Sequence, residues 1–221
     1  MLIIREKGFM MSLSEYKKIN TNTKGNVLKH KSKFFLLRYI NEKFKKDLID
    51  FVLYTNPYKI LDLGCGEGLI TKDIAINLPN SSIIGIDFDN EYINYAKTNN
   101  QKENITYINY NLFEIKYPKN SFDLVITTEV LEHINDFEKA LQNMLNLTKK
   151  YLIISVPYEP WFRIANMLRF KYLSSFGNNP GHINHWSKNQ IRKLCQKYGH
   201  VVKIKTSTFW NIVIIEKLEI N

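Results

Sequence analysis

Short apolar runs alternate with longer amphipathic stretches through the middle of the chain. The runs, rich in β-branched residues, lie at 59–63, 82–87, 105–110, 122–127 and 151–156. Stretches with helical spacing of apolar residues separate them near 68–78, 90–99 and 136–147. Because each run is apolar along most of its length, its strand should be buried on both faces, as in a parallel sheet covered by helices.

The start of the chain departs from this alternation. Residues 1–30 are polar, and we expect them to be loosely ordered. Residues 33–53 carry apolar side chains at helical spacing, and Asn56-Pro57 should end that helix. We therefore expect 1–56 to form a basic N-terminal segment and a helix that flank the ligand-binding cleft of the domain that follows.

The end of the chain predicts one more helix and two more strands. Ser187 and Gln190 form the pattern of a capping box, so a helix should begin there. The apolar runs 200–206 and 209–216 are close enough to pair as an antiparallel hairpin at the sheet edge. Residues 57–221 are thus predicted to form an α/β fold, a doubly wound, mostly parallel seven-stranded sheet with an antiparallel last strand and helices on both faces.

The composition is that of one globular domain in a reducing compartment. A length of 221 residues suits a single core. The only cysteines, Cys65 and Cys195, have no paired spacing, which argues against a disulfide framework. The chain has neither a signal-peptide pattern nor an apolar run of about 18–20 residues that could span a bilayer. We therefore expect a cytoplasmic protein.

Charge is divided unevenly along the chain, whose net charge is +10. Residues 1–60 hold 13 Lys/Arg and 5 Asp/Glu, whereas 61–159 hold 8 and 14. Residues 160–205 hold 9 Lys/Arg and no acid. Basic flanks around an acidic middle predict an anionic partner, such as a phosphate, a nucleic acid, a carboxylate or an anionic membrane surface. The alternative is that these are solvated faces that only aid solubility.

A glycine-rich segment, Asp62-Leu-Gly-Cys-Gly-Glu-Gly68, stands where the first predicted strand meets the first helix. Glycines there let the backbone approach a ligand beyond the carboxyl ends of the strands. Leu69 stands where a dinucleotide-binding G-x-G-x-x-G motif needs a third small residue, and no Lys-Ser/Thr follows as in a P-loop. An acid just before the glycines can meet a ligand ammonium but would repel a pyrophosphate.

A second acid, Asp87, ends the next predicted strand. A carboxylate at that place can accept hydrogen bonds from both hydroxyls of a ribose, and Phe88 beside it offers an apolar face for a purine. The alternative is a strand-end aspartate that caps the following helix. Together, Asp62 and Asp87 favour a nucleoside site.

These motifs resemble the class I S-adenosylmethionine-dependent methyltransferases, particularly the branch that includes the ubiquinone-pathway O-methyltransferases. The segments that carry the resemblance are LDLGCGEG (61–68), GIDFD (85–89), YNLFEI (110–115), FDLVITTEVLEHI (122–134) and SVP (155–157). The family commonly has Asp at the position of Asn111, although an Asn oxygen can still accept from an exocyclic amine.

The resemblance implies S-adenosylmethionine as the cofactor. Its methionine portion would lie on the backbone of Gly64 and Gly66, with Asp62 nearby. Its ribose would bind Asp87, and Asn111 with Leu112 would contact the adenine edge. The implied cofactor contacts are Asp62, Gly64, Cys65, Gly66, Gly68, Asp87, Phe88, Asn111, Leu112 and Thr128.

The segment after the fourth predicted strand bears on the reaction. It reads Thr127-Thr-Glu-Val-Leu-Glu-His133, not the Asn/Asp-Pro-Pro-aromatic loop of enzymes that methylate exocyclic amines of bases. Neither cysteine follows a proline, as the nucleophile of cytosine C5 methylation would. Both nucleic-acid chemistries are therefore disfavoured, while O-methylation, including that of RNA, stays open.

Glu129, Glu132 and His133 have i, i+3, i+4 spacing and would share one face of a helix. His133 can serve as the general base, with Glu129 as a second catalytic candidate. Alternatively the three residues, with His182 or His185, hold a divalent metal ion; oxygen-rich ligation suits Mg²⁺, and histidine admits other ions. This pattern is similar to the metal site of small-RNA 2′-O-methyltransferases and of some ubiquinone-pathway enzymes. A third interpretation is that these residues line the pocket.

Residues 158–187 interrupt the strand–helix alternation and should cover the cofactor cleft. The candidate substrate contacts in this insert are Trp161, Arg163, His182 and His185. Apolar residues in its first half follow helical spacing, which predicts a helix packed on its own domain. The alternative is a helix that lies on a membrane, because Trp and Phe stand at one end and Arg and Lys opposite.

Three functions follow from these features. The first is an O-methyltransferase for a small or lipid-linked, anionic acceptor, which could act at a membrane surface. The second is an RNA O-methyltransferase whose basic flanks bind phosphates. The third is a non-catalytic subunit that binds the cofactor and serves a partner. The glycine spacing disfavours a fourth, a nicotinamide-dependent oxidoreductase.

Overall fold

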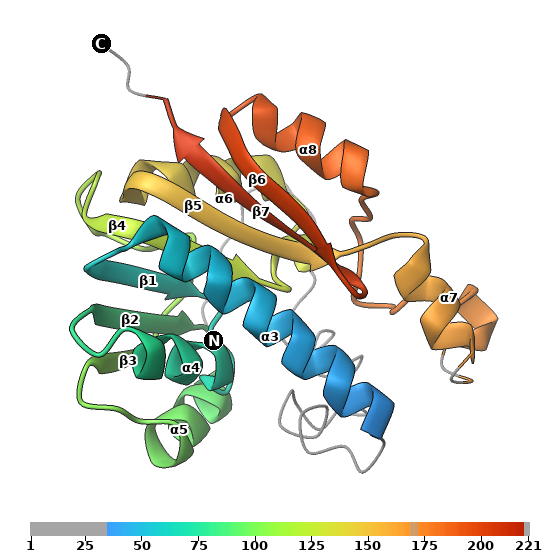
Figure 1. The fold of residues 1–221 in the computed structure, drawn as a ribbon, viewed down its shortest axis with the longest axis horizontal. Helices are drawn as coiled ribbons and strands as arrows, with labels where there is room; N and C mark the ends of the chain where they lie inside the picture. The colour runs from blue at the N-terminus through green and yellow to red at the C-terminus, as the bar shows by residue number, and fades with distance from the viewer. Residues whose placement is uncertain (1–34, 169, 171, 219–221) are drawn as a thin grey trace, which may run out of the picture.

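A single sheet is the framework of the protein. In the structure, a computed structural model that describes residues 35–168, 170 and 172–218, seven strands pair in the order β3-β2-β1-β4-β5-β7-β6 (Figure 1). The strands are β1 (Lys59–Leu63), β2 (Ser82–Asp87), β3 (Ile105–Asn109), β4 (Phe122–Thr128), β5 (Thr148–Pro157), β6 (Gly199–Ser207) and β7 (Trp210–Lys217). Strands β1 to β5 run parallel, and β7 is antiparallel to both β5 and β6. The predicted fold class is confirmed; residues 1–30 lie outside the described residues.

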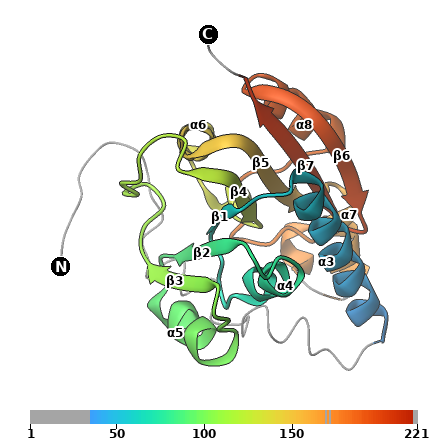
Figure 2. The same cartoon turned by 60° about the vertical axis from the view of Figure 1, so that its left-hand side comes forward.

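Helices cover both faces of the sheet (Figures 1 and 2). They are α3 (Phe35–Thr55), α4 (Leu69–Asn77), α5 (Asn90–Asn99), α6 (Phe137–Leu147), α7 (Trp161–Leu168) and α8 (Lys188–Gln196), with 3-10 turns η1 (Leu131–His133) and η2 (Leu173–Ser175). Ile74 of α4 packs in one buried cluster with Ile60 of β1. Leu141 of α6 packs in a second cluster with Leu61, the next residue of β1. Because successive strand residues point to opposite faces, both faces need apolar side chains, which explains the unbroken apolar runs.

Helix α3 ends within two residues of the prediction. It ends before Asn56, which has a positive φ of 44°. The buried carboxylate of Asp47 accepts hydrogen bonds from Lys43 at 3.1 Å and from Lys205 of β6 at 2.7 Å. This ion pair joins the first described helix to the edge strand.

Between β5 and α8 the chain leaves the sheet. Helix α7 and the turn η2 lie in this insert and project beyond the carboxyl ends of the parallel strands (Figure 1). The chain returns through the predicted capping box, in which Ser187 N donates to Gln190 Oε1 at 2.8 Å and Gln190 N donates to Ser187 Oγ at 3.4 Å. No helix within the described ranges combines the length and the apolar character that crossing a bilayer requires.

Candidate functional site

The glycine loop between β1 and α4 lies at the carboxyl ends of the strands, against the neighbouring strand β2. Gly64 N and Cys65 N both donate to Ile86 O, at 2.8 and 3.0 Å. Gly66 N donates to Asp87 Oδ2 at 2.9 Å. The loop and the end of β2 are therefore one unit, and the structure brings the two predicted acids, Asp62 and Asp87, to the same place.

Asp62 is a buried carboxylate of which only one oxygen accepts a hydrogen bond from the described residues. It is 1% exposed, and its Oδ2 accepts a hydrogen bond from the Thr71 hydroxyl at 2.6 Å. Its Oδ1 is buried and has no hydrogen-bond partner among the residues that the structure describes. Burial raises the pKa of Asp62 to about 7, and the charge of Asp87 adds to this rise. A buried acceptor of this kind fits a ligand ammonium.

Two glycines of the loop are needed for different reasons. Gly64 and Gly66 both have positive φ, at 74° and 54°, which disfavours a residue with a side chain. A Cβ at Gly64 would overlap the side chain of Val130, which follows β4. A Cβ at Gly66 would meet nothing within 4 Å. Gly64 therefore permits close packing inside the protein, whereas Gly66 leaves space open beside the loop.

The start of α4 completes this side of the site. Its N-cap is Gly68, which offers no side-chain hydrogen bond to the first turn. The free N–H groups and the helix dipole make such an end suitable for an anion. Asp62 accepts a hydrogen bond from Thr71 in that same turn. A carboxylate that can bind a cation therefore lies beside N–H groups that can bind an anion. This pair is complementary to a zwitterionic amino acid.

Asp87 organises the loop and does not cap the next helix. Its Oδ1 accepts from Asp89 N at 2.9 Å, while Asp89 itself is the N-cap of α5 and accepts from Glu91 N at 2.8 Å. The alternative of a capping role for Asp87 is therefore wrong. Burial raises the pKa of Asp87, and Phe88 beside it is 44% exposed at the surface of the site.

The predicted adenine edge follows β3. Asn111 Oδ1 accepts from Phe113 N at 3.0 Å and so closes a local turn, a role that sequence reasoning missed. Leu112 is half-buried and packs on the cluster beneath α6. Thr128 is half-buried at the end of β4.

Three of the four predicted metal ligands come together. Glu132 and His133 lie in η1, His182 lies in the insert, and one potential ligand atom from each lies within 4.8 Å of the others. Glu132 is fully buried, and the rings of His133 and His182 meet edge to face with centroids 4.9 Å apart. The fourth predicted ligand, Glu129, is not in this group.

The structure does not form the helix that would put Glu129 on one face with Glu132 and His133. Glu129 has a positive φ of 55°, and its N–H donates to Ser155 O of β5 at 3.1 Å. The chain therefore turns sharply after β4, and only Leu131–His133 forms a short 3-10 turn. The i, i+3, i+4 spacing that would align the three side chains holds only in a continuous α-helix.

Backbone hydrogen bonds attach the insert to η1. Ile183 N and Asn184 N both donate to Glu132 O, at 2.9 and 3.1 Å. The Asn184 side chain donates to Ile134 O at 2.6 Å and to Leu131 O at 3.1 Å. The loop that carries His182 is therefore held against the turn that carries its two partners.

The ring of His133 is oriented by the same loop. Its Nδ1 lies 2.7 Å from Gly181 O, an acceptor that places the proton on Nδ1. Nε2 then carries the lone pair and can accept a proton or bind a metal. The ring of His182 stacks on Phe162 of α7, with centroids 5.3 Å apart.

The remaining candidate substrate contacts have other partners. Arg163 Nε donates to Phe176 O at 3.2 Å, which braces the insert from within. His185 Nδ1 lies 3.5 Å from the carboxylate of Glu159, a buried acid after β5 whose pKa is raised by burial. Sequence reasoning missed Glu159, although an acid between Tyr and Pro at a strand end was a usable signal. Trp161 is half exposed on the surface of the insert.

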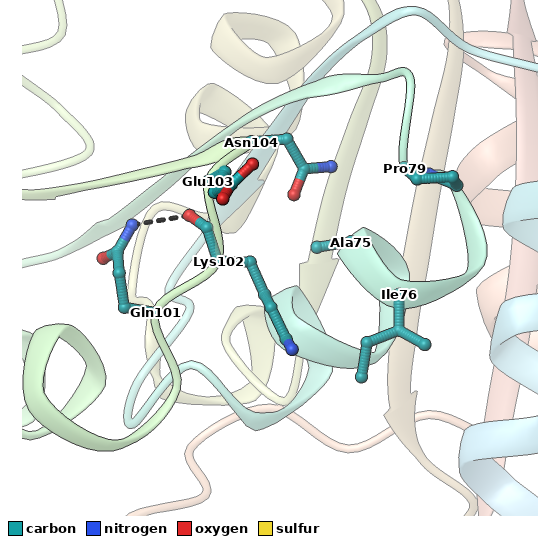
Figure 3. A pocket seen from close by; sticks show the side chains of 7 residues that line it. All are labelled: Ala75, Ile76, Pro79, Gln101, Lys102, Glu103 and Asn104. Carbon is teal, nitrogen blue, oxygen red and sulfur yellow. Dashed lines mark hydrogen bonds between the residues drawn. The ribbon is translucent and has the colours of Figure 1, made fainter.

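A separate surface hollow lies at the opposite end of the sheet (Figure 3). It is formed between the end of α4 and the turn before β3, where Asn104 Nδ2 donates to Leu78 O and Ser81 O. Its lining residues are Ala75, Ile76, Pro79, Gln101, Lys102, Glu103 and Asn104. None of them is a candidate site residue.

Comparison with known proteins agrees with the geometry of the glycine loop. The ubiquinone biosynthesis O-methyltransferase of Pelagibacter ubique is 31% identical over 121 residues, 52% of this chain and 48% of that protein. The bifunctional methyltransferase of Rickettsia prowazekii is 35% identical over 101 residues, 43% of this chain and 19% of that protein. The chain thus spans less than half the length of both relatives.

Solved structures and a family model cover more of the chain. The fold matches magnesium protoporphyrin IX methyltransferase from Synechocystis PCC 6803, solved with bound SAH, with a TM-score of 0.65 at 14% identity over 92% of this chain and 93% of that one. The model of the methyltransferase domain matches residues 55–211, from the end of α3 to the start of β7. Since that match includes every strand but the end of β7, the resemblance is confirmed, and the chain belongs to the class I S-adenosylmethionine-dependent methyltransferases.

Proposed function

We propose that the chain transfers a methyl group from S-adenosylmethionine to an oxygen of a small or lipid-linked, anionic acceptor. The observation that carries this proposal is the convergence of Glu132, His133 and His182 beyond the carboxyl ends of the strands, where the glycine loop also lies. The acceptor oxygen would attack the methyl carbon in line with its bond to sulfur, and S-adenosylhomocysteine would leave as a neutral thioether. The protein would align the two reactants and assist removal of the acceptor's proton.

The amino-acid end of the cofactor fits the first turn of α4. Asp62 Oδ1, buried and without a partner among the described residues, would accept from the ammonium. The uncapped N–H groups after Gly68 would donate to the carboxylate. The open space beside Gly66 would let the cofactor lie against the backbone. The ribose and adenine would extend toward Asp87 and Phe88.

Cofactor affinity should rise with pH between about pH 5.5 and about pH 7. Burial raises the pKa of Asp62 from 3.8 to about 7, so the unliganded protein holds a proton there in this window. A ligand ammonium favours the ionised carboxylate, so binding must release that proton, and affinity should rise up to about tenfold per pH unit. Stability of the unliganded fold should fall over the same window, because the unfolded chain has already lost the proton.

Isothermal titration calorimetry in buffers of different ionisation enthalpy would count the released proton. Asp62→Asn should flatten the pH profile. Asp123→Asn removes a partly exposed carboxylate that accepts from the backbone of Tyr58 and Lys59, far from the loop. That control should keep the wild-type slope. A flat wild-type profile would contradict the role given to Asp62.

The donor set of the cluster fits a divalent transition-metal ion. Glu132 offers a carboxylate oxygen, and His133 and His182 each offer a ring nitrogen. With two imidazoles and one carboxylate, this set favours Mn²⁺, Fe²⁺ or Zn²⁺ over Mg²⁺, which prefers oxygen ligands. When bound, such an ion supplies a Lewis acid that lowers the pKa of the acceptor hydroxyl. The chain itself orients the ligands, through Gly181 O on His133 and the Phe162 ring on His182.

The purified protein should bind Mn²⁺, and Glu132→Gln and His182→Ala should each weaken that binding at least about tenfold. Electron paramagnetic resonance of free Mn²⁺ measures this without any turnover. The matched control is His185→Ala, since His185 lies in the same loop but pairs with Glu159. Equal Mn²⁺ affinity in the wild type and in both cluster variants would leave His133 as a general base without a metal.

The choice of acceptor rests on charge and on the relatives' names. Residues 160–205 hold nine Lys/Arg and no Asp/Glu, and this excess of positive charge suits an anionic acceptor. One relative is named for O-methylation in ubiquinone biosynthesis. The test is incubation with labelled S-adenosylmethionine and separate lipid, small-molecule and RNA fractions, with the His133→Ala variant as the control. Label in the lipid or small-molecule fraction supports the proposal; label in RNA alone, or in no fraction, contradicts it.

A further inference from the structure

The outer side of the insert carries large apolar side chains in water. Leu168 at the end of α7 is 77% exposed, and Phe170 and Phe176 beyond it are 84% and 74% exposed. Trp161 and Leu173 are each more than half exposed. Single exposed apolar residues need no explanation, but five of them within sixteen residues of chain indicate an interaction surface.

The inner side of the same helix is fixed to the site. Phe162 stacks on His182, and Asn166, four residues later, is buried and donates to Gly177 O at 3.0 Å. Residues four apart lie on one side of a helix, and Trp161 and Leu168, seven apart, lie together on another side. Helix α7 therefore links the cluster of Glu132, His133 and His182 to an apolar outer surface.

The shape of this surface fits a bilayer. Helix α7 and the turn after it project from the rest of the domain (Figure 1). Their apolar side chains at 161, 168 and 173 are more than half exposed. A second folded protein would need a matching groove for such a projection, whereas lipid headgroups move aside. An eight-residue helix, about 12 Å long, cannot cross a bilayer but can lie in its interface.

The charge of the segment selects the kind of lipid. Residues 160–187, the segment that includes α7 and η2, hold three Lys/Arg and no Asp/Glu. Basic residues next to exposed apolar ones bind anionic headgroups, while zwitterionic lipid offers no net attraction. An acidic bilayer therefore satisfies both the apolar and the charged part of this surface.

We infer that the outer surface of α7 and η2 docks on an anionic lipid bilayer and places the mouth of the site at the membrane. Trp161, Leu168, Phe170, Leu173 and Phe176 would enter the headgroup region, and the basic residues of the segment would stay at the phosphates. A lipid-linked acceptor could then reach the site without leaving the bilayer. Only this last consequence rests on the proposed function, because docking itself needs no turnover.

Vesicle sedimentation of the full chain tests the inference. The protein should bind phosphatidylcholine vesicles that contain about 30% phosphatidylglycerol but not pure phosphatidylcholine, and salt should weaken the binding. The triple variant Leu168→Ser/Phe170→Ser/Phe176→Ser should bind at least tenfold more weakly. The matched control, Tyr58→Ser/Ile76→Ser/Leu218→Ser, changes three exposed apolar residues at the other end of the sheet and should bind like the wild type.

Two further measurements keep the result specific. Trp186 and Trp210 are buried, so quenching of tryptophan emission by brominated lipid reports mainly on Trp161, and we expect quenching in anionic vesicles. The triple variant should bind S-adenosylhomocysteine as the wild type does, which shows that it is folded and separates docking from catalysis. Absence of binding to anionic vesicles at low salt, or equal binding by the triple variant and the wild type, would overturn the inference.

Discussion

Gly66→Ala should lower the affinity for S-adenosylmethionine by about 100-fold while the protein stays folded. A Cβ at Gly66 enters the open space beside the loop, which the proposed cofactor occupies. The added methyl group would keep the ligand away from the backbone, and ligand-binding loops need glycine for that close approach. The left-handed φ of 54° adds strain of about 1–2 kcal/mol, so thermal denaturation should show only a modest fall in Tm.

Gly64→Ala is the matched control, because it makes the same change two residues away at a similar φ of 74°. There the new Cβ would overlap the side chain of Val130 inside the protein. Overpacking should cost about 1–3 kcal/mol beyond the backbone strain, so this variant should lose more stability than Gly66→Ala. Calorimetric titration with S-adenosylmethionine and thermal denaturation measure both effects. Tight binding by Gly66→Ala would show that the cofactor does not pass over Gly66.

His133→Ala should reduce turnover by about 100-fold or more and leave cofactor binding unchanged. Its ring joins Glu132 and His182, and its Nδ1 is engaged by Gly181 O, so Nε2 is the atom presented for chemistry. Release of S-adenosylhomocysteine in the presence of the labelled acceptor fraction measures turnover. The control is His200→Ala, which should keep most of the activity because His200 is exposed on β6 beside Glu216.

Mn²⁺ titration of the His133→Ala variant separates its two chemical roles. A loss of Mn²⁺ affinity together with turnover assigns His133 as a metal ligand. Lost turnover with unchanged Mn²⁺ affinity assigns it as the general base. Full turnover in His133→Ala would remove the residue from the mechanism altogether.

The parts of the fold that sequence predicted are those with local signals. The strand β1 and its glycine loop form one contiguous segment. Its apolar residues indicate a strand buried on both faces, its glycines indicate positive φ at Gly64 and Gly66, and an acid precedes the loop. The capping box at Ser187 is equally local, since both partners lie within one turn. Such features need no knowledge of the rest of the chain.

The parts that sequence could not predict depend on tertiary contacts. Glu129 departs from the helical pattern because its N–H is taken by Ser155 of β5, a strand formed later in the chain. His182 meets Glu132 only because backbone bonds from the insert reach η1, and nothing in the spacing chose His182 over His185. Glu159 became a buried partner of His185 for the same reason.

The position of β7 makes the order of the last strands in the sheet differ from their order in the chain. β7 follows β6 in the chain, yet it lies between β5 and β6 in the sheet. While the chain is being translated, the outer edge of β5 has no neighbour until residues 210–217 have left the ribosome, and an unpaired apolar edge strand is a template for aggregation. The growing polypeptide therefore exposes this edge of β5 while the roughly 50 residues between β5 and β7 are made, and the pairing of β7 with β5 is a late step in completing the sheet.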